Sequence, residues 1–316
     1  MFEPSVKLTS GAQGSIPLIG FGTWKAESGE VKKAVKAAVA AGIRHIDCAA
    51  VYANEKEVGE ALTEIFAEGK VKRGDLWITS KLWNTCHDPE NVEKAAKSTI
   101  EDLKCEYLDL YLVHWPCAFA FTGLPCRPDT DFCPRDAEGN IKFAKVSLQQ
   151  TWGAMEQLVE KKIVSHIGVS NYPLINILDM LTYCKIKPAV NQIEVHPYNS
   201  REELILECQR LGIHVTAYSP LGSGVGATGP LGDGVIGGIA QALGCSPGQV
   251  ILSWIVQQGV SVIPKSVKAE RIKANAQMVK LSPEQMKEIS GLNKNMVTCD
   301  MRVYWQYPIH YGKTIT

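Results

Sequence analysis

The sequence has no surplus of charge of either sign. Its 316 residues include 33 Lys and Arg against 33 Asp and Glu, so the formal net charge is zero. Domains that bind nucleic acid usually show a basic surplus, so we expect no nucleic-acid partner. A local site for an anion is still compatible with a balanced total.

The sequence also lacks long apolar runs and a secretory leader. No run reaches the roughly 18 residues that a membrane-spanning helix needs. The N-terminus, Met1-Phe2-Glu3-Pro4, has neither the basic start nor the apolar stretch of a signal peptide. We therefore expect a cytoplasmic protein with no membrane part. No exposed apolar stripe demands a second chain, so we expect a monomer.

The ten cysteines include no C-x-x-C pair. In a chain of this length, scattered cysteines are typical of reduced thiols in the cytosol rather than of a disulfide framework. Cys117, Cys126 and Cys133 gather in one polar segment, where surface thiols are the main interpretation. A zinc site there is the weaker interpretation, because no His or fourth Cys falls at ligand spacing.

What the sequence does contain is an alternation of short apolar strands with amphipathic helices. The predicted strands are Ile19–Gly22, His45–Asp47, Leu76–Lys81, Leu108–His114, His166–Val169, Ala189–Ile193, His214–Tyr218 and Val260–Pro264. Helical spacing of apolar residues is clear in Val31–Val39, Val58–Phe66 and Val92–Leu103. Strand–helix alternation implies parallel strands with right-handed crossovers, and eight such units close into a (β/α)₈ TIM barrel. We expect a single barrel domain over residues 1–316.

Additional segments surround this expected barrel. Val6–Thr9 and Ser15–Leu18 predict an N-terminal β-hairpin that plugs the amino-terminal end of the barrel. Pro116–Lys145, Leu221–Gly234 and the tail after Leu292 interrupt or follow the repeat and are expected at the carboxyl-terminal face. Such extra loops are candidates for lids or pocket walls, and ordinary surface loops are an equal alternative.

Four polar residues follow the predicted strands at the end where a parallel barrel carries its active site. Asp47 and Lys81 close two strands, His114 closes a third, and Tyr52 comes five residues after Asp47. Each residue alone has an ordinary structural explanation, such as a turn, a surface charge or a half-buried aromatic ring. Their order across consecutive units predicts that together they form a proton-donating site.

Several separated motifs carry a family resemblance. They are Gly20–Trp24, His45–Asp47 with Tyr52, Ile78–Trp83, His114–Pro116, Gly168–Asn171 and Ile263–Ser266. In this order the motifs resemble the aldo-keto reductase superfamily. The long loop after strand four and the Lys265-Ser266 pair are most similar to its aldehyde and aldose reductase branch. The likeness runs from about Val6 to at least Asn275.

The resemblance implies reduction of aldehydes or ketones to alcohols by NADPH, with roles for the four polar residues. Tyr52 is expected to be the general acid, and the ammonium of Lys81 is expected to lower its pKa from the ordinary value of about 10. Asp47 is expected to hold Lys81 in place. His114 is expected to orient the carbonyl group as a neutral imidazole.

The resemblance also implies which residues bind the cofactor and the substrate. The cofactor residues expected are Thr23, Trp24, Ser170, Asn171, Gln192, Tyr218, Ser219, Leu221, Ser223, Lys265, Ser266, Val267, Arg271 and Asn275. The substrate residues expected are Trp24, Trp83, His114, Trp115 and Trp305. Lys265, Ser266 and Arg271 suit a phosphate, which favours NADP(H) over NAD(H). Asn275 is the candidate for contact with the adenine, although Ala274 stands where the family often has a carboxylate, which weakens any detailed assignment of adenine contacts.

Alternative functions were weighed against this one. A redox-sensing regulatory subunit on the same fold is the main alternative, but such proteins typically carry extra sequence before the first motif. A metal-dependent hydrolase would need clustered ligands at the strand ends, where only His114 is well placed. Gly224–Gly229 satisfies G-x-G-x-x-G, yet no acidic residue lies between Gly234 and Ala269, so we interpret it as a flexible loop over the cofactor.

Overall fold

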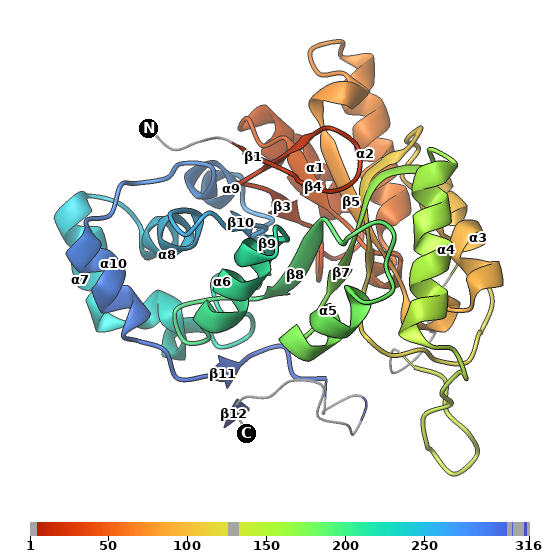
Figure 1. Ribbon diagram of the computed structural model, residues 1–316. Helices are drawn as coiled ribbons and strands as arrows, with labels where there is room; N and C mark the ends of the chain where they lie inside the picture. The colour runs from red at the N-terminus through yellow and green to blue at the C-terminus, as the bar shows by residue number, and fades with distance from the viewer. Residues whose placement is uncertain (1–4, 126–132, 302–304, 306–312, 315–316) are drawn as a thin grey trace.

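The computed structural model describes residues 5–125, 133–301, 305 and 313–314. Eight parallel strands follow one another around a sheet in the order of the chain (Figure 1). They are β3 (Phe21–Gly22), β4 (His45–Asp47), β5 (Trp77–Leu82), β6 (Leu108–Val113), β7 (Val164–Ser170), β8 (Val190–Glu194), β9 (His214–Tyr218) and β10 (Ser261–Val262). A parallel bridge between Ile19 and Val262 brings the last strand to the first. The predicted TIM barrel is confirmed.

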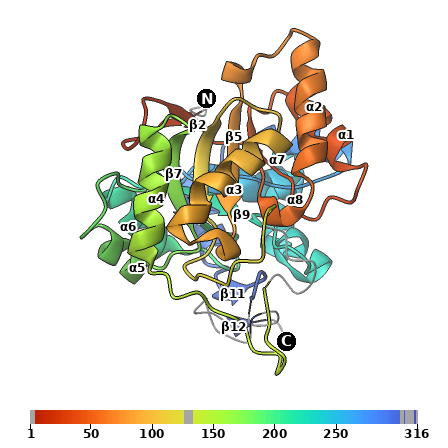
Figure 2. The same cartoon turned by 90° about the vertical axis from the view of Figure 1, so that its right-hand side faces the viewer.

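Helices pack around the outside of the strands (Figure 2). They are α1 (Val31–Ala40), α2 (Glu55–Ala67), α3 (Pro89–Asp102), α4 (Leu148–Glu160), α5 (Leu174–Met180), α6 (Glu202–Arg210), α7 (Gly234–Leu243), α8 (Pro247–Val256), α9 (Ala269–Asn275) and α10 (Pro283–Ser290). The predicted apolar face of α1 is buried along its whole length, from Val31 to Val39. Gly42 and Gly212, which follow α1 and α6, have φ angles of 92° and 69° and so occupy the left-handed region that ends helices.

The N-terminal hairpin covers one end of the barrel. Its strands β1 (Ser5–Lys7) and β2 (Ser15–Pro17) are antiparallel. Leu8 and Ile16 form one buried cluster with barrel residues that include Trp77, Leu110 and Val190. Because Trp77 and Val190 begin their strands, the hairpin plugs the amino-terminal end, as predicted.

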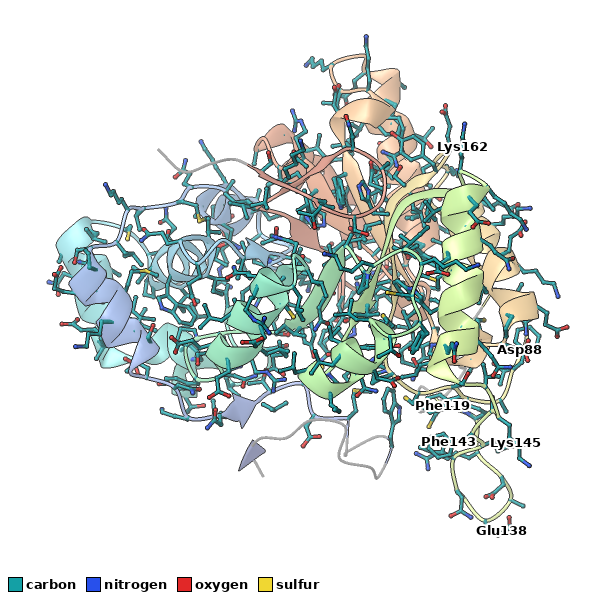
Figure 3. The ribbon with its side chains drawn as sticks, in the orientation of Figure 1. Asp88, Phe119, Glu138, Phe143, Lys145 and Lys162 are labelled. Atoms are coloured by element: carbon teal, nitrogen blue, oxygen red, sulfur yellow. The ribbon has the colours of Figure 1, made fainter. Side chains whose placement is uncertain are left out.

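The extra loops and the C-terminal segment lie at the opposite end from the N-terminus (Figures 1 and 2). In the loop between β6 and α4, antiparallel bridges pair Phe119 with Phe143 and Arg135 with Ile141. Phe119 and Phe143 lie near the base of this loop and Glu138 at its far end (Figure 3). Near the C-terminus, β11 (Met296–Val297) pairs in parallel with β12 (Lys313–Thr314).

The glycine-rich segment after β9 contains two short 3₁₀ helices, η4 (Gly226–Thr228) and η5 (Pro230–Gly232). Its G-x-G-x-x-G sequence therefore does not join a strand directly to an α-helix, as a dinucleotide fingerprint of the Rossmann type requires. Among the described residues no single helix is long and apolar enough to cross a membrane; α7 and α8 pass that test only as a pair, bent by 94°.

All but one of the cysteines that the structure describes are free thiols. Among those described, Cys48, Cys105, Cys117, Cys133, Cys184, Cys208, Cys245 and Cys299 are free thiols. Cys86 is disulfide-bonded, so the expectation of uniformly reduced thiols is wrong at this residue. Cys126 lies outside the described residues, and within the described part of the chain no group of three or more His, Cys, Asp or Glu is arranged to hold a metal ion.

Candidate active site

The carboxyl-terminal end of the barrel brings Asp47, Tyr52, Lys81 and His114 together. Asp47 ends β4 and pairs in register with Thr79 of β5, which places Lys81 one pleat further toward the mouth. The Nζ atom of Lys81 donates to Asp47 Oδ1 at 2.5 Å, to the carbonyl oxygen of Cys48 at 2.9 Å and to Tyr52 Oη at 3.2 Å. The ring centroids of Tyr52 and His114 are 6.0 Å apart.

The ion pair of Lys81 and Asp47 is completely buried, with side chains 0% and 1% exposed. Its polar atoms are nevertheless satisfied, because the three N–H groups of the ammonium each have an acceptor. The second carboxylate oxygen of Asp47, Oδ2, accepts from Gln192 Nε2 at 2.7 Å. Gln192 lies in β8, so this bond ties the pair across the barrel and fixes where the ammonium points.

Burial raises the pKa of Tyr52 to about 12, although the charge and hydrogen bond of Lys81 act to lower it. The expectation that the pKa falls below its ordinary value is therefore wrong for this structure. Desolvation disfavours the phenolate more strongly than the ammonium favours it. The phenol is protonated at neutral pH, which is the state a proton donor needs.

His114 is neutral, as expected. Burial, with the charge of Lys81 and a further contribution from His87, holds the pKa of His114 well below its usual value. The imidazole stacks edge-on against Trp83, with ring centroids 5.1 Å apart. A neutral imidazole carries one N–H donor, so it can donate a hydrogen bond to a substrate oxygen without itself being protonated to the imidazolium.

The structure also brings together the residues predicted to clamp a nicotinamide ring. Tyr218 Oη donates to Asn171 Oδ1 at 2.8 Å, and Asn171 Nδ2 donates to Ser170 Oγ at 3.1 Å and to the carbonyl oxygen of His114 at 3.0 Å. Ser170 Oγ donates in turn to the carbonyl oxygen of Gln192 at 2.8 Å. Asn171 has a φ angle of 64°, which turns the chain just after β7. An aromatic ring beside two side-chain amides fits a planar group that bears a carboxamide.

The remaining predicted cofactor residues are spread over the rim. Thr23 is buried and its hydroxyl donates to the carbonyl oxygen of Asp47 at 2.9 Å, while Trp24 lies with its ring centroid 6.3 Å from that of Tyr52. Ser219, Leu221 and Ser223 follow β9 and are half-buried. Lys265, Val267 and Arg271 are exposed, Ser266 is half-buried and Asn275 is buried. Lys265 Nζ donates to the carbonyl oxygen of Lys25 at 2.8 Å, so this cation lies beside the loop that follows β3.

Aromatic rings wall the space beside His114. Trp115 stacks near His114, and Trp305 contacts Trp83 and Trp115 at centroid distances of 6.1 and 5.1 Å. Phe119, which sequence reasoning missed, packs edge-on against Trp305 at 5.2 Å. The apolar run Ala118–Phe121, within an otherwise polar loop, is the sequence signal that could have identified Phe119 as buried.

Residues 18–294 match the family described as the aldo/keto reductase family. The chain therefore belongs to the aldo/keto reductase family, a family of oxidoreductases. This membership implies a nicotinamide cofactor and small carbonyl substrates.

Individual relatives are similar over almost the whole chain. Aldo-keto reductase family 1 member A1 of Rattus norvegicus is 47% identical over 315 residues, covering 95% of this chain and 94% of the relative. Aldose reductase B of Dictyostelium discoideum is 47% identical and covers 93% and 94%. The solved aldose reductase from Giardia lamblia matches with a TM-score of 0.85 at 46% identity, covering 93% of this chain and 98% of that structure.

Proposed function

We propose that this protein is an NADPH-dependent reductase that converts aldehydes, or ketones, to alcohols, with Tyr52 as the general acid. The observation that carries the proposal is the buried ammonium of Lys81, which lies 3.2 Å from the Tyr52 hydroxyl and is paired with Asp47. An ion pair with only a structural role does not require a phenol hydroxyl within hydrogen-bond distance of its ammonium. The similarity to an aldo-keto reductase family 1 member A1 and to an aldose reductase supports the same activity.

In this proposal each of the four polar residues has a part in one proton transfer, from Tyr52 to the substrate oxygen. The Tyr52 hydroxyl donates its proton to the carbonyl oxygen of the substrate as that oxygen gains negative charge. The Lys81 ammonium then stabilises the phenolate, and Asp47 keeps the ammonium charged and aimed at Tyr52. His114 donates a hydrogen bond to the same oxygen and so orients the carbonyl group. When bound, a reduced nicotinamide supplies the hydride for this chemistry.

The residues that would hold the cofactor fall into two groups. Tyr218 would stack on the nicotinamide, with Ser170, Asn171 and Gln192 beside its carboxamide, and Ser219, Leu221 and Ser223 lie further along the same rim. Thr23 and Trp24 complete the inner rim. Lys265, Ser266, Val267, Arg271 and Asn275 form the outer group. We prefer NADP(H) because the two cations Lys265 and Arg271 suit a 2′-phosphate.

The substrate would sit between the proton donor and the aromatic wall. Trp24, Trp83, Trp115 and Trp305 give that space an apolar body with one polar end at Tyr52 and His114, which suits aldehydes with compact or hydrophobic bodies. We further propose that residues 1–316 act as one domain, as a monomer in the cytoplasm. Cell fractionation tests the compartment and size-exclusion chromatography tests the oligomeric state.

A panel of sugar, aliphatic and aromatic aldehydes, followed by loss of NADPH absorbance and repeated with NADH, tests the proposal. We expect turnover of simple aldehydes with NADPH and a kcat/KM with NADH lower by about tenfold or more, since a charge-assisted bond to the phosphate is lost. Lys265→Ala with Arg271→Ala should remove most of this preference. Tight NADPH binding without turnover of any carbonyl compound would instead support the regulatory-subunit alternative.

A further inference from the structure

Glu194 is a buried carboxylate at the mouth of the barrel to which the proton-transfer scheme assigns no role. It ends β8, two residues after Gln192, and is 3% exposed. Its Oε1 atom accepts from the backbone N–H of Thr298 at 2.7 Å, from Thr298 Oγ1 at 2.7 Å and from His196 Nε2 at 2.9 Å. Its Oε2 atom accepts from the backbone N–H of Cys299 at 3.1 Å.

These four donors stabilise the negatively charged form of the Glu194 carboxylate. Burial alone raises the pKa of Glu194, but the hydrogen bonds from His196 and Thr298 outweigh this effect and leave the pKa below its usual value. The group is therefore an ionised carboxylate that only accepts hydrogen bonds. A glutamine in the same place would present an NH₂ group to one of these donors, so the amide would be a poor substitute.

The residues that Glu194 holds begin the segment that supplies part of the aromatic wall. Thr298 and Cys299 lie just before Met301, whose carbonyl oxygen accepts from the backbone N–H of Trp305 at 2.7 Å. Trp305 is 1% exposed and packs between Trp115 and Phe119. The described residues of this segment are therefore held at two places: Thr298 and Cys299 by the carboxylate, and Trp305 by the aromatic rings.

We propose that Glu194 is a positioning residue for substrate selection: by holding residues 298–299 against the end of β8, it sets the place of the Trp305 wall relative to Tyr52 and His114. This inference rests on the proposed reductase function. Large aromatic aldehydes need that wall, whereas small aliphatic aldehydes need only the proton donor and His114. Loosening the anchor should therefore weaken the first class of substrate more than the second.

Glu156 provides a matched control for Glu194. It is also a buried carboxylate, 6% exposed, and its Oε1 atom accepts from the backbone N–H groups of Lys185 and Ile186 at 2.6 and 2.8 Å. Those residues precede β8, at the opposite end of the barrel from Thr298. A neutral amide at either position removes a buried anion, but only the change at Glu194 loosens the mouth.

The test compares Glu194→Gln with Glu156→Gln in the full chain with NADPH. The ratio of kcat/KM for 4-nitrobenzaldehyde to that for propanal should fall about tenfold in Glu194→Gln, as expected for loss of a charge-assisted anchor, and should stay unchanged in Glu156→Gln. Alkylation of Cys299 by iodoacetamide, followed by peptide mass spectrometry, should become faster only in Glu194→Gln. Glu194→Asp, which keeps the charge, should recover part of both effects and serves if the glutamine variant does not fold.

The possible results distinguish failure of the Glu194 positioning role from failure of the proposed reductase function. A Glu194→Gln enzyme that folds and keeps both the wild-type substrate ratio and the wild-type alkylation rate overturns the positioning role. Equal changes in both glutamine variants also overturn it, because they would reflect general loss of stability. If the wild-type protein reduces neither aldehyde, the proposed function fails, while faster alkylation in Glu194→Gln would still show that the carboxylate holds the segment.

Discussion

Two ion pairs, one fully buried at the mouth of the barrel and one partly buried at its base, are chemically alike and differ in what surrounds them. At the mouth, Lys81 pairs with Asp47 at 2.5 Å. At the base, Arg73 of η2 (Arg73–Asp75) pairs with Asp109 of β6 at 2.8 Å, with side chains 12% and 15% exposed. Both pairs connect neighbouring segments of the barrel, so geometry alone would mark both as structural.

The difference lies in the third partner. At the base, Arg73 also donates to the carbonyl oxygens of Leu76 and Tyr107, and Asp109 accepts from the backbone N–H of Ile78. At the mouth, Lys81 instead reaches the hydroxyl of Tyr52, a group that can give up a proton. A buried ion pair is weak evidence of function by itself, whereas a pair that ends on a titratable hydroxyl beside an aromatic wall indicates chemistry.

The largest expected effect comes from removing that hydroxyl. Tyr52→Phe should lower kcat for aldehyde reduction by about 10³-fold, within the range of 10² to 10⁴ for loss of a general acid, while the fold and NADPH binding persist. Steady-state kinetics with NADPH measure it. Tyr107→Phe at the base, beside the Arg73 guanidinium, is the matched control and should leave kcat unchanged. Equal activity in the two variants would remove Tyr52 from the mechanism.

The second prediction separates the two ion pairs. Lys81→Met leaves Asp47 buried without its cation, so the free energy of unfolding should fall by about 3–5 kcal/mol, and kcat should fall at least 10²-fold because the phenolate loses its ammonium. Arg73→Met should lower the free energy of unfolding by about 1–3 kcal/mol, since backbone and Asp109 acceptors lose their donors. Its kcat should change less than about threefold, because the pair lies at the far end of the barrel.

Urea unfolding and steady-state kinetics on both variants measure these changes. If Arg73→Met lost as much turnover as Lys81→Met at matched stability, the distinction between a structural and a functional pair would be wrong. If Lys81→Met kept full turnover, Tyr52 would not depend on the ammonium.

Much of the fold was predictable from local pattern. β4 and β9 match the predicted ranges His45–Asp47 and His214–Tyr218, and most residues of the apolar faces predicted for α1, α2 and α3 are buried. Other strand ends differ because ladder hydrogen bonds decide them. β10 covers Ser261–Val262 rather than the predicted Val260–Pro264; at the predicted end, Pro264 has no N–H to donate to a ladder. β5 continues to Leu82 because its partner Val113 extends the ladder.

The grouping of Lys81 and His114 at the mouth was predictable, because Lys81 lies near the end of its strand and His114 directly follows its strand. Two features were not. The direction of the Tyr52 pKa depends on how deeply the phenol is buried, which no local sequence pattern gives. The anchor at Glu194 joins residues 104 positions apart, and neither Glu194 nor Thr298 has a local signal that names the other. Such contacts depend on tertiary packing alone.

The smallest expected effect is that of pH, which should change the free energy of unfolding but not kcat/KM. Burial lowers the pKa of His45 to about 4 and that of His214 to about 3, from an ordinary value of 6.5. Both histidines begin their strands near the base. Below pH 6.5 these histidines are protonated in the unfolded chain but stay neutral in the folded chain. Their contribution to the free energy of unfolding is therefore complete above pH 6.5 and decreases as the pH drops toward 4. Each such histidine contributes up to about 1.4 kcal/mol per pH unit.

Urea unfolding at pH 7.5, 6 and 5 measures this slope, and His214→Gln should make it shallower because the amide does not titrate. In contrast, kcat/KM should stay flat between pH 6 and 8, because the pKa of Tyr52 is about 12 and that of His114 lies well below 6.5. A stability slope that His214→Gln does not change would assign acid sensitivity to other groups. A kcat/KM that titrates near pH 7 would mean that a group at the mouth changes charge there.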